Sequence, residues 1–182
     1  DTKQQLGAYS IPTYVHVVAV TDPGIATGNV TSKAIDDQLA FINRAYSSNA
    51  ARAGVSWDFQ LLNVTYSTTT SDSDMCKPES EAQVKQQLRQ GGKDTLNLYV
   101  TDLSACGVLG FSTWPWDMTQ EDNGLIMDGV VVHYDTLPRG DYAMYNLGGT
   151  AAHEIGHWLG LFHTFENGCV PPGDHVQDTP YC

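Results

Sequence analysis

The sequence predicts an α+β fold whose larger part is α/β-like, with a twisted mixed sheet and helices packed on its face. Two observations predict it. Segments rich in β-branched and aromatic residues alternate along the chain with segments of helical periodicity, and the alternation ends in a helix near the C-terminal end. With 182 residues the chain fits one domain that buries a substantial core, and we expect residues 1–182 to form it.

The first half of the chain is expected to supply two strands and a long helix between them. The segment 11–20 is β-branched and aromatic, and a turn sequence at 22–24 follows it. Residues 32–52 place apolar side chains at helical spacing, and residues 55–66 alternate as a half-buried strand does. The apolar positions that carry the helical pattern are Ile35, Leu39, Ile42 and Tyr46.

The second half continues the alternation. We expect a polar surface loop, a short helix opened by Pro78, a strand, a glycine-rich aromatic stretch, another strand and a final helix. In chain order these are residues 67–73, 78–91, 95–101, 107–116, 129–134 and 147–159.

The charge of the chain limits its binding partners, and its cysteines and sequons indicate the compartment in which the protein is found. Nine basic against 21 acidic residues give a formal charge of −12, which disfavours nucleic acid and anionic lipid, and no segment is long and apolar enough for a membrane span. No signal peptide opens the sequence, so the chain is either cytosolic or already processed. Sequons at Asn29 and Asn63, and four cysteines without CxxC spacing, favour a secreted, extracellular protein.

The segment 153–163, HEIGHWLGLFH, carries the chemistry. His153 and His157 lie one helical turn apart, about 40° from each other around the axis, so both imidazoles can reach one ion. His163 can supply a third ligand if Gly160 adopts positive φ and turns the chain back. The pattern therefore predicts a zinc ion held by three histidines with one coordination position open, as catalytic sites require.

Glu154 is the candidate general base. It follows the first ligand by one residue and lies about 100° further around the helix, so it can face the open position without being a ligand. Zinc polarises a scissile carbonyl and acidifies water, and a carboxylate can carry the proton to the leaving amine. The alternative is a closed structural zinc site, but such sites usually have a fourth ligand and are rich in cysteine. We interpret His16, His133 and His175 as ordinary core or surface residues.

The segment from His153 to His163 resembles the metzincin clan of zinc endopeptidases. His163-Thr164-Phe165, followed by Gly168-Cys169 and by the residue groups 173–174 and 178–180, is similar to the pappalysin family and most of all to its fungal extracellular members. The resemblance is concentrated between residues 148 and 180, and upstream it extends only to the pattern of elements. It implies a metzincin fold with a backing helix, an active-site helix and an upper subdomain over about residues 1–163.

The resemblance also implies further site residues. A sheet edge should border the cleft and bind substrate as an antiparallel strand. Our candidate edge ends at Trp114, although Trp114 and Trp116 fit a core role equally well. Calcium is implied in the loop after the third histidine, with Asp174 and Thr179 as candidate ligands and Asp178 as a residue that orients the loop; an ordinary acidic turn is the alternative. The candidate edge residues are Gly110, Phe111, Ser112 and Thr113.

One departure from the metzincin pattern concerns the methionine turn, which follows the third histidine in that clan. All four methionines of this chain precede His153, so we expect residues 164–182 to be only the start of a lower subdomain, with the rest absent or on a separate C-terminal fragment of the same precursor. Cys76 and Cys106 are expected to form one disulfide. Cys169 and Cys182 either pair with each other or each bind elsewhere.

Together the motif and the resemblance predict a secreted zinc-dependent metalloendopeptidase that acts on protein or peptide substrates as a monomer. The alternative is a non-catalytic binding module that keeps zinc as part of its fold, which the missing lower subdomain would favour. The two hypotheses differ in what they require of Glu154.

Overall fold

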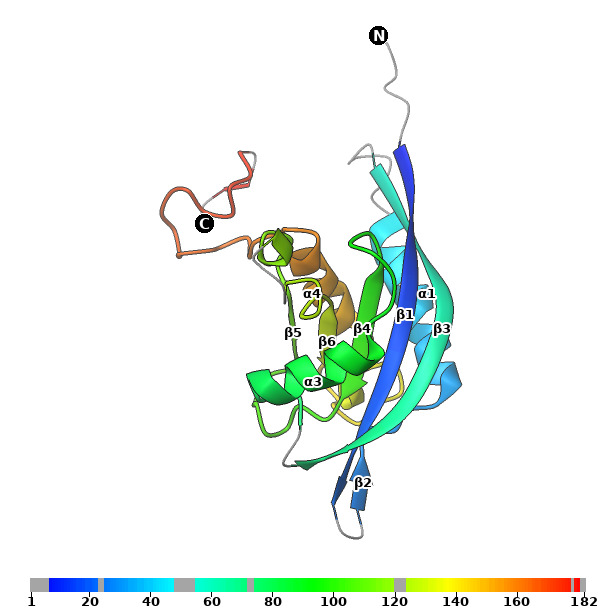
Figure 1. Cartoon of the computed structure of the whole chain (residues 1–182). Coiled ribbons are helices and arrows are strands. Elements are labelled where there is room, and N and C mark those ends of the chain that lie inside the picture. Colours follow the sequence, from blue (N-terminus) through cyan, green and yellow to red (C-terminus); the bar gives the residue numbers. More distant parts are fainter. Residues whose placement is uncertain are drawn as a thin grey trace.

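The chain folds around a twisted mixed sheet (Figure 1). The structure is a computed structural model, and it describes residues 7–22, 25–47, 55–71, 74–119, 124–177 and 179–180. The elements in chain order are β1 (Gly7–Asp22), β2 (Ile25–Thr27), α1 (Ser32–Ser47), β3 (Val55–Thr70), α3 (Pro78–Leu88), β4 (Leu96–Thr101), β5 (Gly110–Ser112), the 3₁₀ turn η2 (Asp117–Thr119), β6 (Val130–His133), the 3₁₀ turn η3 (Tyr134–Thr136) and α4 (Gly149–Trp158).

The long strand β1 lies in the interior of the sheet. It pairs in parallel with β3 on one side and with β4 on the other, and β2 joins its end as a short antiparallel strand. The sheet continues from β4 to the parallel strand β6 and ends at β5, which is antiparallel to β6. The predicted mixed α+β sheet is confirmed. None of the described helices is long and apolar enough to cross a membrane.

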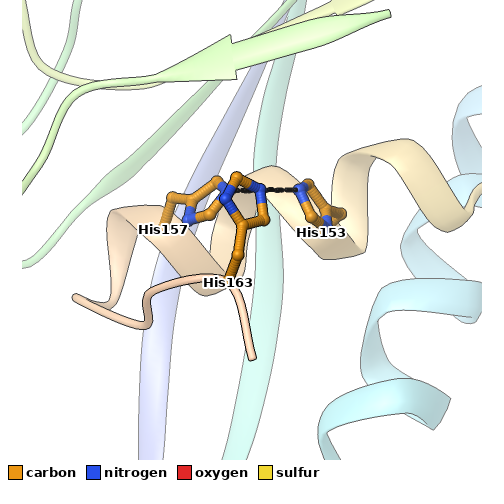
Figure 2. A group of neighbouring side chains, drawn as sticks. All are labelled: His153, His157 and His163. Atoms are coloured by element: carbon orange, nitrogen blue, oxygen red, sulfur yellow. Dashed lines mark hydrogen bonds between the residues drawn. The ribbon is translucent and has the colours of Figure 1, made fainter. Parts of the chain in front are cut away.

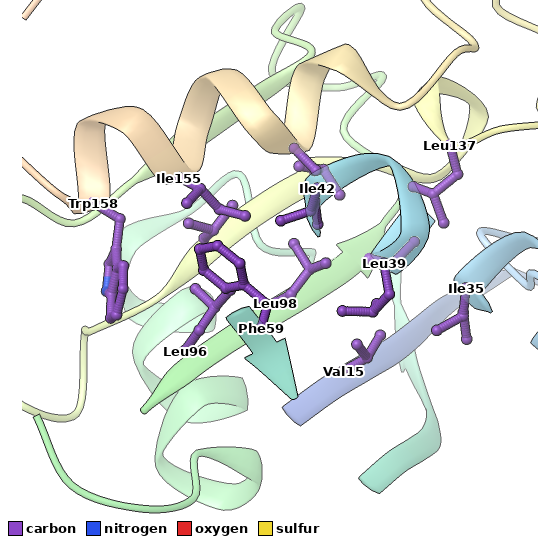
Figure 3. Packing of buried hydrophobic residues seen from close by; sticks show 14 of the residues in the cluster. Val15, Ile35, Leu39, Ile42, Phe59, Leu96, Leu98, Leu137, Ile155 and Trp158 are labelled. Carbon is purple, nitrogen blue, oxygen red and sulfur yellow. The ribbon is translucent and has the colours of Figure 1, made fainter. Parts of the chain in front are cut away.

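The main core lies between the sheet and one layer formed by α1 and α4 (Figure 3). The periodic residues of α1 pack here, because the helical pattern puts them on one face. On α4, Ile155 is fully buried and Trp158 is 6% exposed, and both pack against the same cluster. This packing fixes the helix that carries the histidines against a rigid sheet. The α1 residues in the cluster are Ile35, Leu39 and Ile42, with Tyr46 at its border.

The helix α3 covers the other face of the sheet around a smaller cluster that includes Met75 and Tyr99. A disulfide joins Cys76, just before α3, to Cys106 in the loop after β4, as expected for this pair. Cys169 is also disulfide-bonded, whereas Cys182 lies outside the described residues.

Buried charges connect α3 to α4 through the segment before β6. The carboxylate of Asp128 is fully buried, and it accepts hydrogen bonds from Arg89 Nη2 at 2.7 Å and from Trp158 Nε1 at 2.8 Å. A second buried cation lies on α3. The ammonium of Lys85 donates to Met127 O at 2.6 Å and lies 2.6 Å from Glu81 Oε1. Burial lowers the pKa of Lys85, and its acidic neighbours oppose that shift.

The strand β3 is longer than predicted. The sequence predicted a surface loop over residues 67–73, but residues 67–70 continue β3 and pair with residues 18–21 of β1. Polarity alone suggested a loop, yet threonine is β-branched and one side of an outer strand can face water, so the tract remains in the sheet. The helix predicted over residues 32–52 is described to Ser47, and residues 48–54 lie outside the described part. The boundary between subdomains near residue 163 stays a prediction.

The three histidines outside the motif have the ordinary roles predicted for them. His16 is fully buried, with Nδ1 2.8 Å from Thr65 Oγ1 and Nε2 3.0 Å from Asn97 Oδ1. The Nδ1 atom of His133 accepts the backbone N–H of Leu103 at 3.0 Å. His175 is exposed.

Candidate metal centre

The end of α4 is shaped by its glycines. After Trp158 the N–H of Gly160 donates to His157 O at 2.8 Å, and the N–H of Leu161 donates to Gly156 O at 2.9 Å. These two bonds form a Schellman motif with Gly160 in the left-handed region, at φ 92°. The predicted glycine turn is confirmed, and it directs the chain back toward the face of α4 that carries the other two histidines.

The turn brings the three histidines of the motif together (Figure 2). The Nε2 atoms of His153 and His157 are 3.1 Å apart, those of His157 and His163 are 3.1 Å apart, and those of His153 and His163 are 3.2 Å apart. His157 is buried, and the other two rings are exposed. Among the described residues this is the one group of three or more potential ligands placed to share an ion.

The partners of the other ring nitrogens favour a cation at the centre of this group. His157 Nδ1 donates to Leu161 O at 2.7 Å, and His163 Nδ1 lies 3.3 Å from Glu166 Oε2 and donates to it. A neutral imidazole with a proton on Nδ1 has a bare lone pair on Nε2. Two such lone pairs 3.1 Å apart repel each other unless a cation lies between them, so these outer contacts suit both rings to bind a metal ion.

The spacing of the three nitrogens also fits zinc. Ligand nitrogens at about 2.0–2.1 Å from a tetrahedral zinc ion are roughly 3.3 Å apart, close to the 3.1–3.2 Å observed. Burial lowers the pKa of His153, and the charges of the other two histidines lower it further, which favours the neutral form that binds metal. Three nitrogen donors on one side leave the opposite side of an ion open.

Glu154 follows His153 on α4 and is not one of the residues placed to share an ion. Its side chain is 8% exposed, and burial raises the pKa of its carboxyl to about 7. A Cβ atom added to Gly110 would lie 2.8 Å from Glu154 Cγ, so the carboxyl-bearing side chain packs directly under the first residue of β5. Glu154 therefore lies next to His153 in the chain and packs against Gly110 of β5.

Aromatic rings form one border of the centre. The ring of Trp114, two residues after β5, lies 4.9 Å from the ring of His157, and it stacks on Trp116 at 4.8 Å. Phe162 lies beside both tryptophans. The two tryptophans are therefore part of the border of the metal centre and not of the main core. On another side a cavity of about 510 Å³ opens at the three histidines, between α4, Tyr46 of α1 and the turn after α4.

The other predicted site residues lie outside this group. Asp174 Oδ1 accepts the N–H of Val176 at 3.0 Å within its own turn, Thr179 donates its N–H to Val176 O, and Asp178 lies outside the described residues. The sequon residues Asn29 and Asn63 are both exposed.

Several contacts of the centre could not be found from the motif. Neither the Leu161 carbonyl that orients His157 nor the packing of Gly110 on Glu154 leaves a signal in the sequence. The contact between Glu166 and His163 does have a sequence signal, because Glu166 is an acidic residue three positions after His163. That spacing could have identified Glu166 as the partner of the outer ring nitrogen of His163.

Comparison with known proteins adds family membership. Residues 79–182 match the peptidase M43 family, described as pregnancy-associated plasma protein-A. An extracellular metalloprotease of Verticillium alfalfae is 39% identical over 172 residues, which cover 93% of this chain and 58% of that protein. One from Neurospora crassa is 40% identical over 172 residues, covering 94% of this chain and 56% of the relative. The chain thus spans less than two thirds of the length of these relatives.

Solved structures agree with the family match. Mature mirolysin of Tannerella forsythia, in complex with a cleaved peptide, superposes with a TM-score of 0.72 at 25% identity, over 94% of this chain and 71% of that one. A promirolysin mutant of the same organism has the same fold, with a TM-score of 0.69 at 24% identity, over 93% of this chain and 62% of that one. The chain belongs to the peptidase M43 family, that of pregnancy-associated plasma protein-A.

Proposed function

We propose that this chain is the zinc-binding part of a secreted metalloendopeptidase that hydrolyses internal peptide bonds of proteins. The observation that carries the proposal is the convergence of three imidazole nitrogens within 3.2 Å of one another beside a buried glutamate. His153, His157 and His163 are the proposed zinc ligands, and their outer hydrogen bonds suit neutral, metal-binding tautomers.

Zinc held there would polarise the scissile carbonyl and make a water molecule easier to deprotonate near neutral pH. Glu154 is the proposed general base. Its carboxylate takes the proton of the attacking water and then passes it to the departing amine. Burial supports this role because a carboxyl with a pKa raised to about 7 is a stronger base than an exposed one, although a nearby cation would lower that value again.

The proposed substrate-binding edge is β5 with the next residue, Thr113. One side of β5 pairs with β6, and no described strand pairs with its other side. Gly110 lies over Glu154, and Trp114 lies beside His157, so the strand runs along the metal centre. A peptide added antiparallel to Gly110, Phe111 and Ser112 would receive main-chain hydrogen bonds while its scissile bond faced Glu154.

This placement makes Gly110 a sensitive position. A Cβ atom at residue 110 would lie 2.8 Å from Glu154 Cγ and 2.9 Å from Val131 O, so either the base or the strand must move. We expect Gly110→Ala to lower kcat by about 100-fold, as displacements near 1 Å at a reacting group do, while bound zinc is retained. Gly149→Ala is the matched control, because an added Cβ there meets no atom within 4 Å. Equal kcat for both variants would contradict the arrangement.

The extracellular location is part of the proposal. The fungal relatives are named extracellular metalloproteases, and a disulfide between Cys76 and Cys106 suits an oxidising compartment. The proposed partners are protein or peptide substrates. A monomer, and association with a C-terminal fragment of the same precursor, stay predictions of the sequence, as does calcium at Asp174 and Thr179.

The direct test of the proposal is metal removal from the natural full-length protein. A zinc chelator such as 1,10-phenanthroline should abolish cleavage of an unfolded protein substrate, and added zinc should restore it, because no other described group of residues is placed to share an ion. Cleavage that continues at the same rate after the zinc has been removed, as measured by metal analysis, would refute the proposal.

A further inference from the structure

The outer strand β3 has a long free edge. It is 16 residues long and pairs with β1 along its length, and no described strand lies on its other side (Figure 1). The unpaired N–H and C=O groups of such an edge can template pairing with another chain, and proteins usually blunt them with charge, proline, bulges or a covering element. In β3 such protections are found before residue 63, and the stretch that follows lacks them.

The first half of β3 is protected in two ways. Asn43 of α1 donates from Nδ2 to Phe59 O at 3.0 Å, and its Oδ1 accepts the N–H of Phe59 at 2.8 Å, so the side chain occupies the backbone groups that another strand would use. Further along, Leu61 pairs with Thr13 and Asn63 pairs with Tyr14, which leaves Leu62 as an extra residue in a bulge. Bulges interrupt the ladder and twist an edge.

The stretch that follows the bulge, residues 63–68, has neither of these protections among the described contacts. It reads NVTYST, with no charge and no proline and with three β-branched residues, a composition that favours strand pairing in any register. Tyr66 is 54% exposed on this part of the strand, and so is Leu62 in the bulge just before it. The sequon Asn63-Val64-Thr65 lies at the start of this unprotected stretch.

The position of Asn63 suits an attached sugar. Asn63 is exposed, and because side chains alternate along a strand it lies on the same face as Thr65, whose Oγ1 contacts His16. That is the face opposite α1, and further along the strand α3 and residues 67–69 line a common pocket. A chain of sugars starting at Asn63 would therefore project from an uncovered part of the sheet, next to the free edge and the exposed Leu62.

We propose that Asn63 carries an N-linked glycan that prevents residues 63–68 of β3 from pairing with other chains. In the transfer step the Asn63 Nδ2 atom forms a bond to C1 of the first N-acetylglucosamine of a lipid-linked oligosaccharide pyrophosphate. The lipid pyrophosphate leaves and the amide loses one proton, so no oxidant or reductant is needed. The inference depends on the secretory route within the proposed function, but not on peptidase activity.

The sequon at Asn29 provides a matched control. It lies between β2 and α1, where Thr31 Oγ1 accepts the N–H of Ala34 at the start of the helix, and it belongs to no sheet edge. A glycan there would add similar mass and solubility without covering β3. Any effect that is specific to Asn63 therefore comes from its place on the strand.

The test uses the natural full-length protein secreted from yeast. Peptide mapping should find Asn63 glycosylated. After incubation of the folded protein, size-exclusion chromatography with light scattering should show several-fold more association for Asn63→Gln than for Asn29→Gln, and Asn63→Lys, which puts a charge on the edge, should restore the monomer. If Asn63→Gln fails to fold, enzymatic deglycosylation of folded Asn29→Gln protein gives the same comparison.

Two results would overturn the inference. One is secreted protein in which Asn63 carries no glycan, and the other is protein that stays monomeric after its Asn63 glycan is removed. Either result leaves the proposed function standing if chelator-sensitive cleavage persists. Conversely, a glycosylated, monomeric protein without peptidase activity would refute only the proposed function.

Discussion

Replacing Glu154 with glutamine should lower kcat by about 10²- to 10⁴-fold while the zinc content of the protein stays near that of the wild type. Glutamine keeps the size and the packing under Gly110 but cannot accept the proton of the attacking water. The three imidazole nitrogens do not depend on this carboxylate, so metal binding should persist. Steady-state cleavage of a quenched peptide, together with metal analysis of the same sample, measures both quantities.

The control for this variant is Glu79→Gln, which removes an exposed carboxylate from the first turn of α3. It should leave kcat unchanged. A Glu154→Gln protein with wild-type turnover would exclude Glu154 as the general base. Loss of turnover together with loss of zinc would instead make Glu154 part of the metal site, which disagrees with its position under β5.

Replacing Asp128 with asparagine should destabilise the protein by about 3–5 kcal/mol, the usual cost of leaving one member of a buried ion pair without its partner. Asp128 is fully buried between Arg89 and Trp158, and each of these residues donates a hydrogen bond to one of its carboxylate oxygens. In asparagine one of those oxygens is replaced by an NH₂ group, which is itself a donor and would face the donor of Arg89 or of Trp158. Since Trp158 directly follows His157, a proposed zinc ligand, we also expect weaker zinc binding. Urea unfolding at neutral pH measures the stability change.

The comparison for Asp128 is Asp37→Asn, which breaks ion pairs with Lys33 and Arg139 at the surface. Water screens these pairs, so the urea midpoint should hardly move. If Asp128→Asn were as mild as Asp37→Asn, the buried network would not be what holds α3 and the end of α4 together. An apolar replacement of both Arg89 and Asp128 should recover part of the lost stability, because it removes both charges.

The parts of the molecule that the sequence predicts well are those whose signal is local. The three histidines lie within eleven consecutive residues, and one glycine with positive φ suffices to bring them together, so the sequence alone predicts the grouping of His153, His157 and His163. The core face of α1 follows in the same way from helical periodicity.

The parts that escaped prediction depend on residues far apart in the chain. The bond between Asp128 and Trp158 spans 30 residues, and the contact of Asn43 with Phe59 joins a helix to a strand. The loop prediction for residues 67–70 was wrong because it relied on their polarity, whereas their pairing with β1 decides their structure. Which strand would lie over Glu154 depends on the whole sheet, so the packing of Gly110 becomes visible only in three dimensions.

The central claim is that three histidines and no other protein group hold one zinc ion, and X-ray absorption at the zinc edge tests it most directly. For protein with one zinc per chain, the account predicts three imidazole nitrogens at about 2.0–2.1 Å, a further oxygen or nitrogen at the open position and no sulfur. Replacing His163 with alanine should remove one imidazole from that shell. A sulfur ligand at about 2.3 Å, or a shell closed by four protein ligands, would contradict a catalytic site and indicate a structural one.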